Sequence, residues 1–473
     1  MTLAIIGAGI IGTAIARELS RYELDILLLE KEPEACMGTS KANSAILHGG
    51  FDAIPGTLKA RLNVRGNALY HQFAKELSIP LENIGSLVLT RDCDDQDRLV
   101  ELKERGEING VKGLEIWDRQ TLEQREPELS ESVCSALYSP SAGIICPFQA
   151  TFAFLENAME NGVTFLPDTK LLAVHKRDGK YLLNTDNGEF LVDSLINAAG
   201  VDAGHVASML GDEIEIIPRK GQYRVLDKGE REKYHHVLFG LPEEHSKGVL
   251  VVPTVHGNVL LGPTSEVMED RHDLSTDVEG IDFVDSAVRK LIKEPSIART
   301  IRLFSGVRAS TPGGDFRIEE SENSPGCIHV AGIDSPGLTA APAIAEYVAE
   351  ILLKKILLRE KEHVVTTRRG TTTVHNMRAE ERHLRIQQDK EAGEILCRCE
   401  MVTLAEVKEA IRRPGGARTV GGVKRRVRPG SGRCQGGFCE SRILKVLQEE
   451  LALQDEEVQK EGRGSWMMRR RDD

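Results

Sequence analysis

Short apolar runs and stretches with helical spacing alternate at the start of the chain. Residues 3–6 form an apolar run, residues 13–21 carry apolar positions at helical spacing, and residues 25–29 form a second apolar run. This pattern predicts a strand, a helix and a second strand parallel to the first. Short alternating runs further along, such as residues 86–90 and 249–253, predict strands of another sheet.

A glycine-rich turn joins the first predicted strand to the helix. In Gly7-Ala8-Gly9-Ile10-Ile11-Gly12, Gly7 permits the tight turn, Gly9 lets the backbone approach a pyrophosphate, and Gly12 allows the helix to pack closely on the strand. Glu30 ends the second apolar run eighteen residues beyond Gly12, where a dinucleotide site places a carboxylate for ribose hydroxyls. The unit predicts dinucleotide binding; the alternative is a glycine-rich turn without a ligand.

Three further segments rich in small residues favour FAD over a nicotinamide cofactor. They cover residues 38–44, 194–200 and 332–339, and the last leads into an apolar helix predicted over 340–353. The positive end of that helix could face an electron-rich flavin ring. Segments so far apart in sequence imply one long cofactor lying across the domain.

The order of these segments resembles the D-amino-acid-oxidase type of FAD-dependent enzyme over about residues 1–355. Within that group the chain is similar to FAD-dependent glycerol-3-phosphate dehydrogenases and L-2-hydroxyglutarate oxidases, on residues 43–50, 55–60 and 305–308. The resemblance implies an α/β (α+β) fold with two interleaved domains. They are a Rossmann-like FAD-binding domain at about 1–80, 145–210 and 305–355, and an antiparallel-sheet substrate domain at about 81–144 and 211–304. The cofactor-binding residues that it implies are Gly7, Gly9, Ile10, Ile11, Gly12, Glu30, Lys31, Thr39, Ser40, Asn43, Ser44, Val174, Ala198, Ala199, Gly200, Gly306, Gly332, Pro336, Gly337, Leu338 and Thr339.

Oxidation of an alcohol by a flavin requires a proton acceptor and a cation that holds an anionic substrate. The resemblance places His48 beside the flavin ring, where it is the candidate base, or a structural or flavin-tuning histidine. Arg308 is the candidate anion clamp, because a guanidinium binds carboxylate or phosphate in a two-pronged fork. Arg317 and Lys59 are second candidates, with surface ion pairing as the alternative for each. Tyr223 fits either the site lining or ordinary strand packing.

Four of the nine cysteines lie close together near the C-terminus. Cys397 and Cys399 form a CxC pair and Cys434 and Cys439 a CxxxxC pair, beside predicted helices at 404–413 and 440–451. Four thiolates at these spacings can bind a [2Fe-2S] cluster, whereas a structural zinc site more often uses CxxC pairs. On residues 433–439, the segment 394–450 resembles the bacterioferritin-associated-ferredoxin-like [2Fe-2S] domain. Residues 356–393 are then expected to be a linker with some helix and 451–473 a tail, disordered from Gly462 onward.

Residues 412–433 contain eight basic residues and no acidic one. Three interpretations remain open. The cations could neutralise and tune a negatively charged cluster, form a solvated face, or dock an acidic redox partner. Nucleic-acid binding is the least favoured, because base-stacking aromatic residues are absent there.

Two features point to different substrates. In aerobic glycerol-3-phosphate dehydrogenases an arginine that helps to bind phosphate follows the His-Gly-Gly turn, but here Phe51 and Asp52 follow it, and residues 55–60 resemble the 2-hydroxyglutarate branch. The cysteine module instead resembles that of the anaerobic glycerol-3-phosphate dehydrogenase large subunit. This favours a dehydrogenase for glycerol 3-phosphate with a second flavoprotein or another electron-acceptor subunit as partner. The alternatives are a 2-hydroxy-acid or amino-acid dehydrogenase, or a non-catalytic electron-transfer subunit.

Composition sets the remaining limits. The chain has 61 basic and 73 acidic residues, a net charge of −12, which disfavours a nucleic-acid or anionic-membrane surface across the protein. No run approaches the length of about 18 apolar residues that a transmembrane helix needs, and the first residues lack a basic secretion signal. We therefore expect a cytoplasmic protein, membrane-associated only through a partner. An odd number of cysteines makes a disulfide framework a poor explanation for them.

Overall fold

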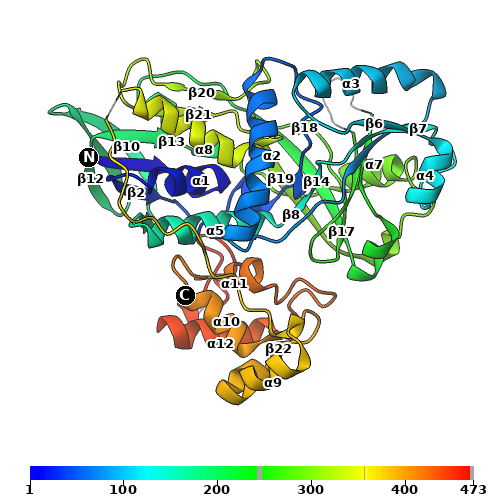
Figure 1. Cartoon of the computed structure of the whole chain (residues 1–473). Helices are drawn as coiled ribbons and strands as arrows, with labels where there is room; N and C mark the ends of the chain where they lie inside the picture. Colours follow the sequence, from blue (N-terminus) through cyan, green and yellow to red (C-terminus); the bar gives the residue numbers. More distant parts are fainter. Residues whose placement is uncertain (242–247, 356, 469–473) are drawn as a thin grey trace.

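The body of the protein is built around two large sheets, and a small C-terminal module lies beneath them (Figure 1). The computed structural model describes residues 1–241, 248–355 and 357–468. The first sheet is parallel except for its edge strand β20. In spatial order its strands are β20 (Arg317–Glu320), β21 (Ile328–Ala331), β13 (Ser194–Asn197), β1 (Thr2–Ile6), β2 (Asp25–Leu29) and β9 (Thr164–Leu166).

Helices cover the parallel sheet, which explains its continuous apolar strands. Three of them pack together with the sheet in one apolar core: α1 (Ile10–Leu19), α5 (Pro147–Glu160) and α8 (Gly337–Leu353). The strands predicted at 3–6 and 25–29 are present, β13 occupies the apolar start of the segment 194–200, and α8 begins three residues before the predicted start at 340. The expected βαβ arrangement at the N-terminus is therefore confirmed.

The second sheet is mainly antiparallel, as predicted, and combines strands from two separate segments of the chain. One of its pairs is parallel, between β5 and β15, because these strands come from different passes of the chain through this domain. The longest pairing joins β14 to β19. The strands run in the order β18 (Glu266–Val267), β14 (Ile217–Leu226), β17 (Val259–Gly262), β16 (Leu250–Pro253), β15 (Val237–Gly240), β5 (Ser86–Thr90), β7 (Ser135–Ser139) and β6 (Glu115–Asp118), with β19 (Thr300–Ser310) beside β14.

Smaller elements complete the body. Two three-stranded sheets consist of β3 (Ile46–Leu47), β8 (Gly143–Ile145) and β4 (Leu81–Glu82), and of β10 (Leu171–Arg177), β11 (Lys180–Thr185) and β12 (Gly188–Val192). The remaining helices are α2 (Leu58–Glu76), α3 (Gln96–Ile108), α4 (Arg119–Arg125), α6 (Ala203–Met209) and α7 (Val278–Val288).

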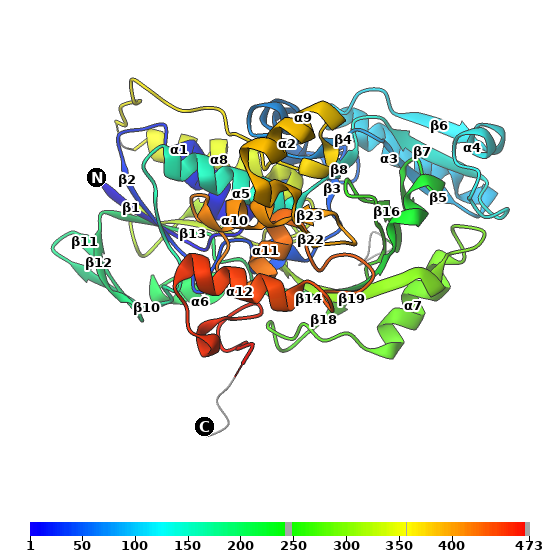
Figure 2. The same cartoon turned by 90° about the horizontal axis from the view of Figure 1, so that it is seen from below.

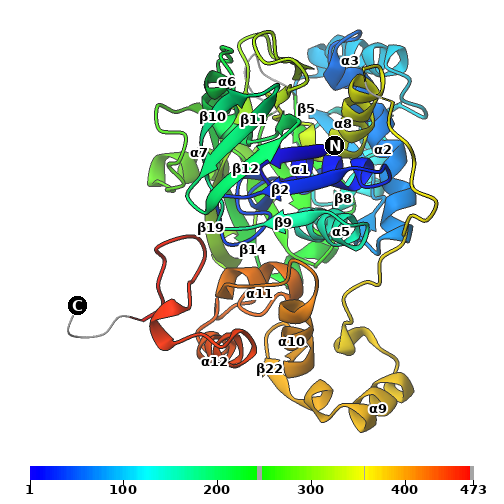
Figure 3. The ribbon, with the colours of Figure 1, turned by 90° about the vertical axis from the view of Figure 1, so that its left-hand side faces the viewer.

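The C-terminal module has its own apolar core, formed by residues between Leu396 and Val458. A long connection descends along the side of the body from α8 to α9 (Ala379–Gln388) and leads into the module (Figure 3). The module contains β22 (Ile395–Cys397), β23 (Val402–Thr403), α10 (Leu404–Arg412), α11 (Val420–Val427) and α12 (Glu440–Leu451). The two helices predicted from the sequence correspond to α10 and α12.

The residues after α12 differ from the expected disordered tail. Val458 is fully buried, and the backbone N–H of Met467 donates to its carbonyl oxygen. Arg463 binds the carboxylates of Asp168 and Asp186 on the body. The segment up to residue 468 therefore folds back onto the body, because its charged residues have partners there. The three consecutive arginines at 469–471 lie outside the described residues.

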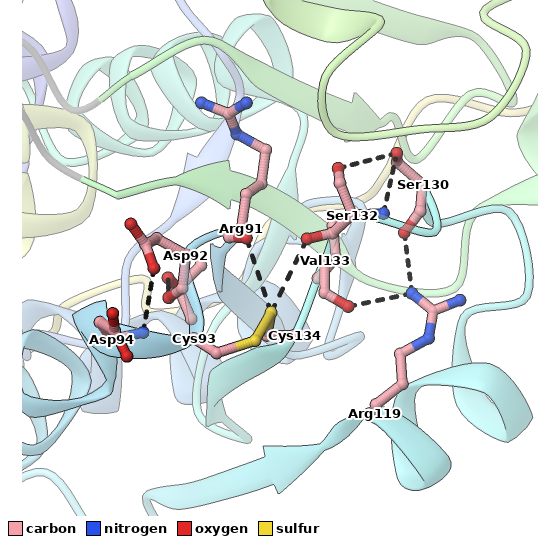
Figure 4. The surroundings of a disulfide bond; sticks show 10 residues. Arg91, Asp92, Cys93, Asp94, Arg119, Ser130, Ser132, Val133 and Cys134 are labelled. Carbon is pink, nitrogen blue, oxygen red and sulfur yellow. Dashed lines mark hydrogen bonds between the residues drawn. A yellow bond between two sulfur atoms is a disulfide. The ribbon is translucent and has the colours of Figure 1, made fainter.

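The structure pairs Cys93 and Cys134 in a disulfide (Figure 4). The bond connects residues 41 apart in sequence, one just before α3 and the other just before β7. A disulfide was not expected from the odd number of cysteines, and nothing in the spacing of these two residues predicts that they meet.

Within the described ranges, no helix combines the length and the apolar character that crossing a bilayer requires.

Candidate active site

The glycine-rich turn between β1 and α1 has the geometry expected for close approach of a ligand. Gly7 has a φ of +102°, and a Cβ atom there would lie 2.6 Å from the carbonyl oxygen of Ala198 on the neighbouring strand. A Cβ atom on Gly12 would lie 1.9 Å from the carbonyl oxygen of Gly7. Both positions therefore require glycine. The first turn of α1 carries no acidic residue, so the positive end of the helix is open to an anion.

Glu30 stands at the end of β2 beside this turn. One oxygen of its carboxylate accepts a 2.8 Å hydrogen bond from the backbone N–H of Ala8, and the other a 3.0 Å bond from that of Glu32. Burial raises the pKa of Glu30 to about 7, despite these two bonds to the ionised form.

A cavity of about 620 Å³ runs from the glycine-rich turn to the second sheet. It brings together segments that are hundreds of residues apart in sequence. The predicted site residues that line it are Gly7, Gly9, Ile10, Ile11, Glu30, Lys31, Thr39, Ser40, Asn43, Ser44, His48, Ala198, Ala199, Gly200, Gly306, Arg308, Pro336, Gly337 and Leu338.

Four predicted cofactor-binding residues lie outside the lining. Gly12 acts through the packing of α1 on the turn, and Gly332 has a φ of +68° and packs against Thr311. Thr339 supports the cavity wall from behind, because its hydroxyl accepts a hydrogen bond from the backbone of His48. The side chain of Val174, on β10, packs into a separate apolar cluster.

His48 is held from several sides. Its backbone N–H donates to the hydroxyl of Thr339 at 2.9 Å, and its carbonyl oxygen accepts a 3.0 Å bond from the side-chain amide of Asn67. Its Nε2 atom lies 3.3 Å from the hydroxyl of Ser335. The imidazole therefore has a defined position in the cavity wall.

Arg308, on β19, also lines this cavity. One Nη atom donates to the carbonyl oxygen of Thr264 at 3.0 Å, whereas the buried Nε has no hydrogen-bond partner within the part of the chain that the structure describes. A buried N–H without a partner is costly, so it favours an acceptor supplied by a ligand. Tyr223 completes this wall; its hydroxyl lies 3.1 Å from that of Ser44, and burial raises its pKa.

The two second-rank candidates have different surroundings. The Nζ atom of Lys59 lies 2.5 Å from a carboxylate oxygen of Asp334, which lines the cavity, so this lysine reaches the site only through Asp334. Arg317 pairs with Glu319 and donates to the carbonyl oxygen of Glu213 outside the cavity. The surface ion-pair alternative therefore describes Arg317, because its strand lies at the edge of the parallel sheet.

One part of the lining was missed by the sequence analysis. Arg271, His272 and Leu274 come from the segment after β18 and line the cavity beside residues 200–205. His272 lies 3.3 Å from Asp202, and Arg271 donates to the carbonyl oxygen of Val201. No local motif marks this segment, since only the packing of one domain on the other brings it there.

The four C-terminal cysteines form two pairs. The sulfur atoms of Cys399 and Cys434 lie 3.6 Å apart, close to the separation of roughly 3.8 Å for two thiolates on one tetrahedral metal ion. A hydrogen bond with Cys439 lowers the pKa of Cys397 to about 6 and raises that of Cys439. Among the described residues, no group of three or more His, Cys, Asp or Glu side chains is arranged around a single ion.

The basic segment 412–433 anchors the module to the body. Arg425 and Arg426 on α11 are only 6% and 5% exposed, so the solvated-face interpretation is wrong for them. Arg425 binds Glu461 at 2.5 Å and lies 3.8 Å from Glu34. Arg426 faces Glu156 at 3.5 Å, and that carboxylate also binds Arg368 of the connection and Arg413 of the module.

The residues present fit both groups that the sequence implies. The glycine turn, the open end of α1 and the unpaired Nε of Arg308 line one elongated cavity, as an extended dinucleotide with an anionic substrate beside it requires. The four cysteines would supply the four thiolates that a [2Fe-2S] cluster requires, with Cys399 and Cys434 already 3.6 Å apart.

Comparisons with known proteins agree with this geometry. The family described as FAD dependent oxidoreductase matches residues 2–351, and the BFD-like [2Fe-2S] binding domain matches residues 395–449. The chain is 43% identical to a glycerol 3-phosphate dehydrogenase of Caloramator mitchellensis, over 98% of both chains. It is 28% identical to a mitochondrial L-2-hydroxyglutarate dehydrogenase of Arabidopsis thaliana, over 74% of this chain and 83% of that one.

A solved structure supports the same assignment. The dithionite-reduced L-alpha-glycerophosphate oxidase of Mycoplasma pneumoniae with FAD bound superposes with a TM-score of 0.74 at 30% identity, over 78% of this chain and 98% of that one. The predicted fold class and the two predicted cofactors, FAD and a [2Fe-2S] cluster, are thereby confirmed. The chain belongs to the FAD-dependent oxidoreductase family and carries a BFD-like [2Fe-2S] binding domain at its C-terminal end.

Proposed function

We propose that the protein is a dehydrogenase that oxidises glycerol 3-phosphate to dihydroxyacetone phosphate and delivers the electrons through FAD and the cluster to a partner. One observation carries the proposal: His48 and Arg308 both line the cavity that the glycine-rich turn opens into. The relative from Caloramator mitchellensis supports the substrate, because its similarity extends over both the body and the cysteine module.

The two ends of the cavity suggest different occupants. The end lined by Gly7, Glu30 and Gly200 suits the nucleotide half of FAD, with the pyrophosphate at the start of α1. The opposite end, lined by His48, Tyr223 and Arg308, suits the flavin ring and the substrate. FAD, when bound, supplies a two-electron acceptor for hydride, and the cluster carries single electrons.

In this proposal the chain's own residues bind, orient and deprotonate the substrate. Arg308 holds the phosphate with its Nε and one Nη, which places the substrate between the second sheet and His48. The Nε2 atom of His48 accepts the hydroxyl proton as hydride leaves the adjacent carbon. Ser335 and Asn67 keep this histidine in place during the reaction.

The electron acceptor is a separate protein in this proposal. Cys399 is exposed, and Phe438, which directly precedes Cys439, is 83% exposed. An acceptor can therefore approach this side of the cysteine loops. A second flavoprotein subunit fills that role, and a membrane association arises only through such a partner.

A 2-hydroxy acid is the second candidate substrate. The L-2-hydroxyglutarate dehydrogenase relatives and the Phe51-Asp52 pair after the His-Gly-Gly turn favour it. Arg308 suits a carboxylate as well as a phosphate, so this residue does not discriminate between the two substrates.

Anaerobic flavin reduction discriminates between the candidates. The holoprotein is mixed separately with glycerol 3-phosphate and with L-2-hydroxyglutarate, and the flavin absorbance is followed. We expect fast bleaching with glycerol 3-phosphate only. Bleaching with the hydroxy acid only would replace the substrate, and no bleaching with any small anion would favour an electron-transfer subunit.

A further inference from the structure

One face of the β14–β19 pair extends from the cavity to the cysteine module. Alternate residues of a strand share a face, so Arg308, Gly306, Phe304 and Arg302 lie in a row along β19. Arg308 and Gly306 line the cavity. Arg302, at the other end of the row, donates a long hydrogen bond of 3.5 Å to the side chain of Gln435, next to Cys434.

An aromatic pair occupies the middle of this row. Tyr223 of β14 lies directly opposite Phe304 of β19, and their rings stack with centroids 4.7 Å apart and planes 5° from parallel. Tyr223 lines the cavity, whereas Phe304 lies two residues, or about 7 Å, from Arg302 along the strand. The stack therefore begins at the cavity wall and lies across the two strands, at a level of β19 between Gly306 of the cavity and Arg302 beside Gln435.

The end of β14 also fixes the position of both cysteine loops. Asp227, directly after β14, binds Arg433, the neighbour of Cys434. Lys228 binds Glu400, the neighbour of Cys399, at 2.9 Å. The side chain of Glu400 is buried, at 2% exposure, whereas that of Lys228 is 42% exposed. Figure 2 shows the start of α12 lying beneath β14 and β19.

We propose that the β14–β19 pair is the electron route between flavin and cluster, with Tyr223 and Phe304 as its aromatic bridge and Asp227 as the residue that positions the cysteine loop. The inference rests on the proposed function. The rate of electron transfer through protein falls steeply with distance. A polarisable aromatic stack between two redox groups therefore shortens the distance that an electron must cross in one step.

The electrons and protons balance along this route. Oxidation of a secondary alcohol to a ketone breaks one C–H and one O–H bond and releases two electrons and two protons. Hydride carries both electrons and one proton to FAD, and the hydroxyl proton goes to His48. The electrons would then pass singly to the cluster, which a one-electron acceptor such as ferricyanide would reoxidise each time. The proton carried with the hydride would leave the flavin and the hydroxyl proton would leave His48, both to solvent.

Phe304→Leu tests the route, because it removes the ring from a half-buried position while keeping an apolar side chain. The anaerobic holoprotein is mixed with glycerol 3-phosphate, flavin bleaching is followed by absorbance, and cluster reduction by electron paramagnetic resonance of freeze-quenched samples. We expect flavin bleaching within twofold of wild type and cluster reduction at least tenfold slower. Phe304→Tyr should retain the wild-type rate. Phe283→Leu, the same change at an exposed phenylalanine of α7, is the matched control.

Asp227→Asn provides a second test of the route, because it weakens the contact with Arg433 that positions the cysteine loop. It should also slow cluster reduction, with unchanged iron content and an unchanged cluster potential in an equilibrium titration. Wild-type cluster reduction in Phe304→Leu would overturn the route, and so would an equal slowing of flavin bleaching and cluster reduction.

Reduction of the flavin by light with oxalate as donor separates this inference from the proposed substrate. The light pulse supplies electrons without glycerol 3-phosphate, so a failure of that substrate leaves the route testable. A tenfold difference between Phe304→Leu and wild type under light supports the route on its own. Equal rates under light overturn it, whatever the substrate.

Discussion

The carboxylate of Glu34 accepts two hydrogen bonds from Thr419, one from its backbone N–H and one from its hydroxyl, each 2.7 Å long. Glu34 lies four residues beyond Glu30, in the loop that leaves the nucleotide-binding strand, and Thr419 is the N-cap of α11. A carboxylate at the positive end of a helix is favourable, and here it comes from another domain. The nucleotide-binding body thus holds the cluster module in place.

Glu34→Ala should loosen the module from the body. The change removes one of the two carboxylates near Arg425 and the carboxylate that Thr419 hydrogen-bonds. We expect it to lower the free energy of unfolding by about 3 kcal/mol. The measurements are thermal unfolding and the rate of trypsin cleavage within residues 356–393. Glu23→Ala, at a half-exposed ion pair with Arg359, is the control and should change stability by less than about 0.5 kcal/mol. Equal behaviour of the two variants would contradict the anchoring role.

Arg308→Lys should weaken substrate binding, because an ammonium group lacks the two-pronged fork. Loss of one charge-assisted hydrogen bond, worth roughly 1.5–3 kcal/mol, corresponds to a KM raised about tenfold to a hundredfold. Steady-state kinetics with an artificial acceptor measure this change. Arg317→Lys is the matched control, since its side chain lies outside the cavity. If both variants raise KM equally, Arg308 is not the anion clamp.

Glu30 should make the stability of the FAD-free protein depend on pH. Burial raises its pKa to about 7 from the ordinary 4.5, so the folded state binds the proton more tightly than the unfolded state. The stability it contributes is present below about pH 4.5 and is lost as the pH rises to about 7, with a total of about 3 kcal/mol. Urea unfolding across this range should show a steeper decline in the wild type than in Glu30→Gln. Parallel curves would refute the prediction.

Cys434→Ser should abolish the cluster and spare the flavin chemistry. Serine removes one thiolate of the Cys399–Cys434 pair, so iron content and the visible absorbance of the cluster should fall to background. Flavin bleaching by substrate should stay within about twofold of wild type, because the cavity lies in the body. Cys134→Ser, in the disulfide-bonded pair, is the control and should retain its iron. Retention of the cluster in Cys434→Ser would exclude this cysteine as a ligand.

Local sequence motifs were sufficient to predict the sites whose residues lie close together along the chain. The turn from Gly7 to Gly12 and the carboxylate of Glu30 lie within one βαβ unit, so their spacing along the chain sets their spacing in space. The cysteine pairs likewise lie on short loops beside helices. Arg308 was found through the resemblance to a known family, and the cavity contains it.

Charge patterns were less informative, because burial depends on what packs against a residue. From its sequence, the basic segment 412–433 is indistinguishable from a solvated face. The structure shows that Arg425 and Arg426 pair with Glu34 and Glu156 of the body. Arg317 and Arg308 were both plausible clamps, and only the position of their strands separates them. The Cys93–Cys134 bond joins residues whose separation carries no signal.

The sequence by itself therefore determined the cofactor classes, the fold class and a set of candidate site residues, most of which line the cavity, because short motifs encode local geometry that a cofactor requires. Only the tertiary structure decided how the module sits on the body, which cations are buried, and that Tyr223 and Phe304 stack between the cavity and the cysteine loops. The physical reason is that strand pairing and ion pairing between distant segments depend on long-range packing, which leaves no periodic trace along the chain.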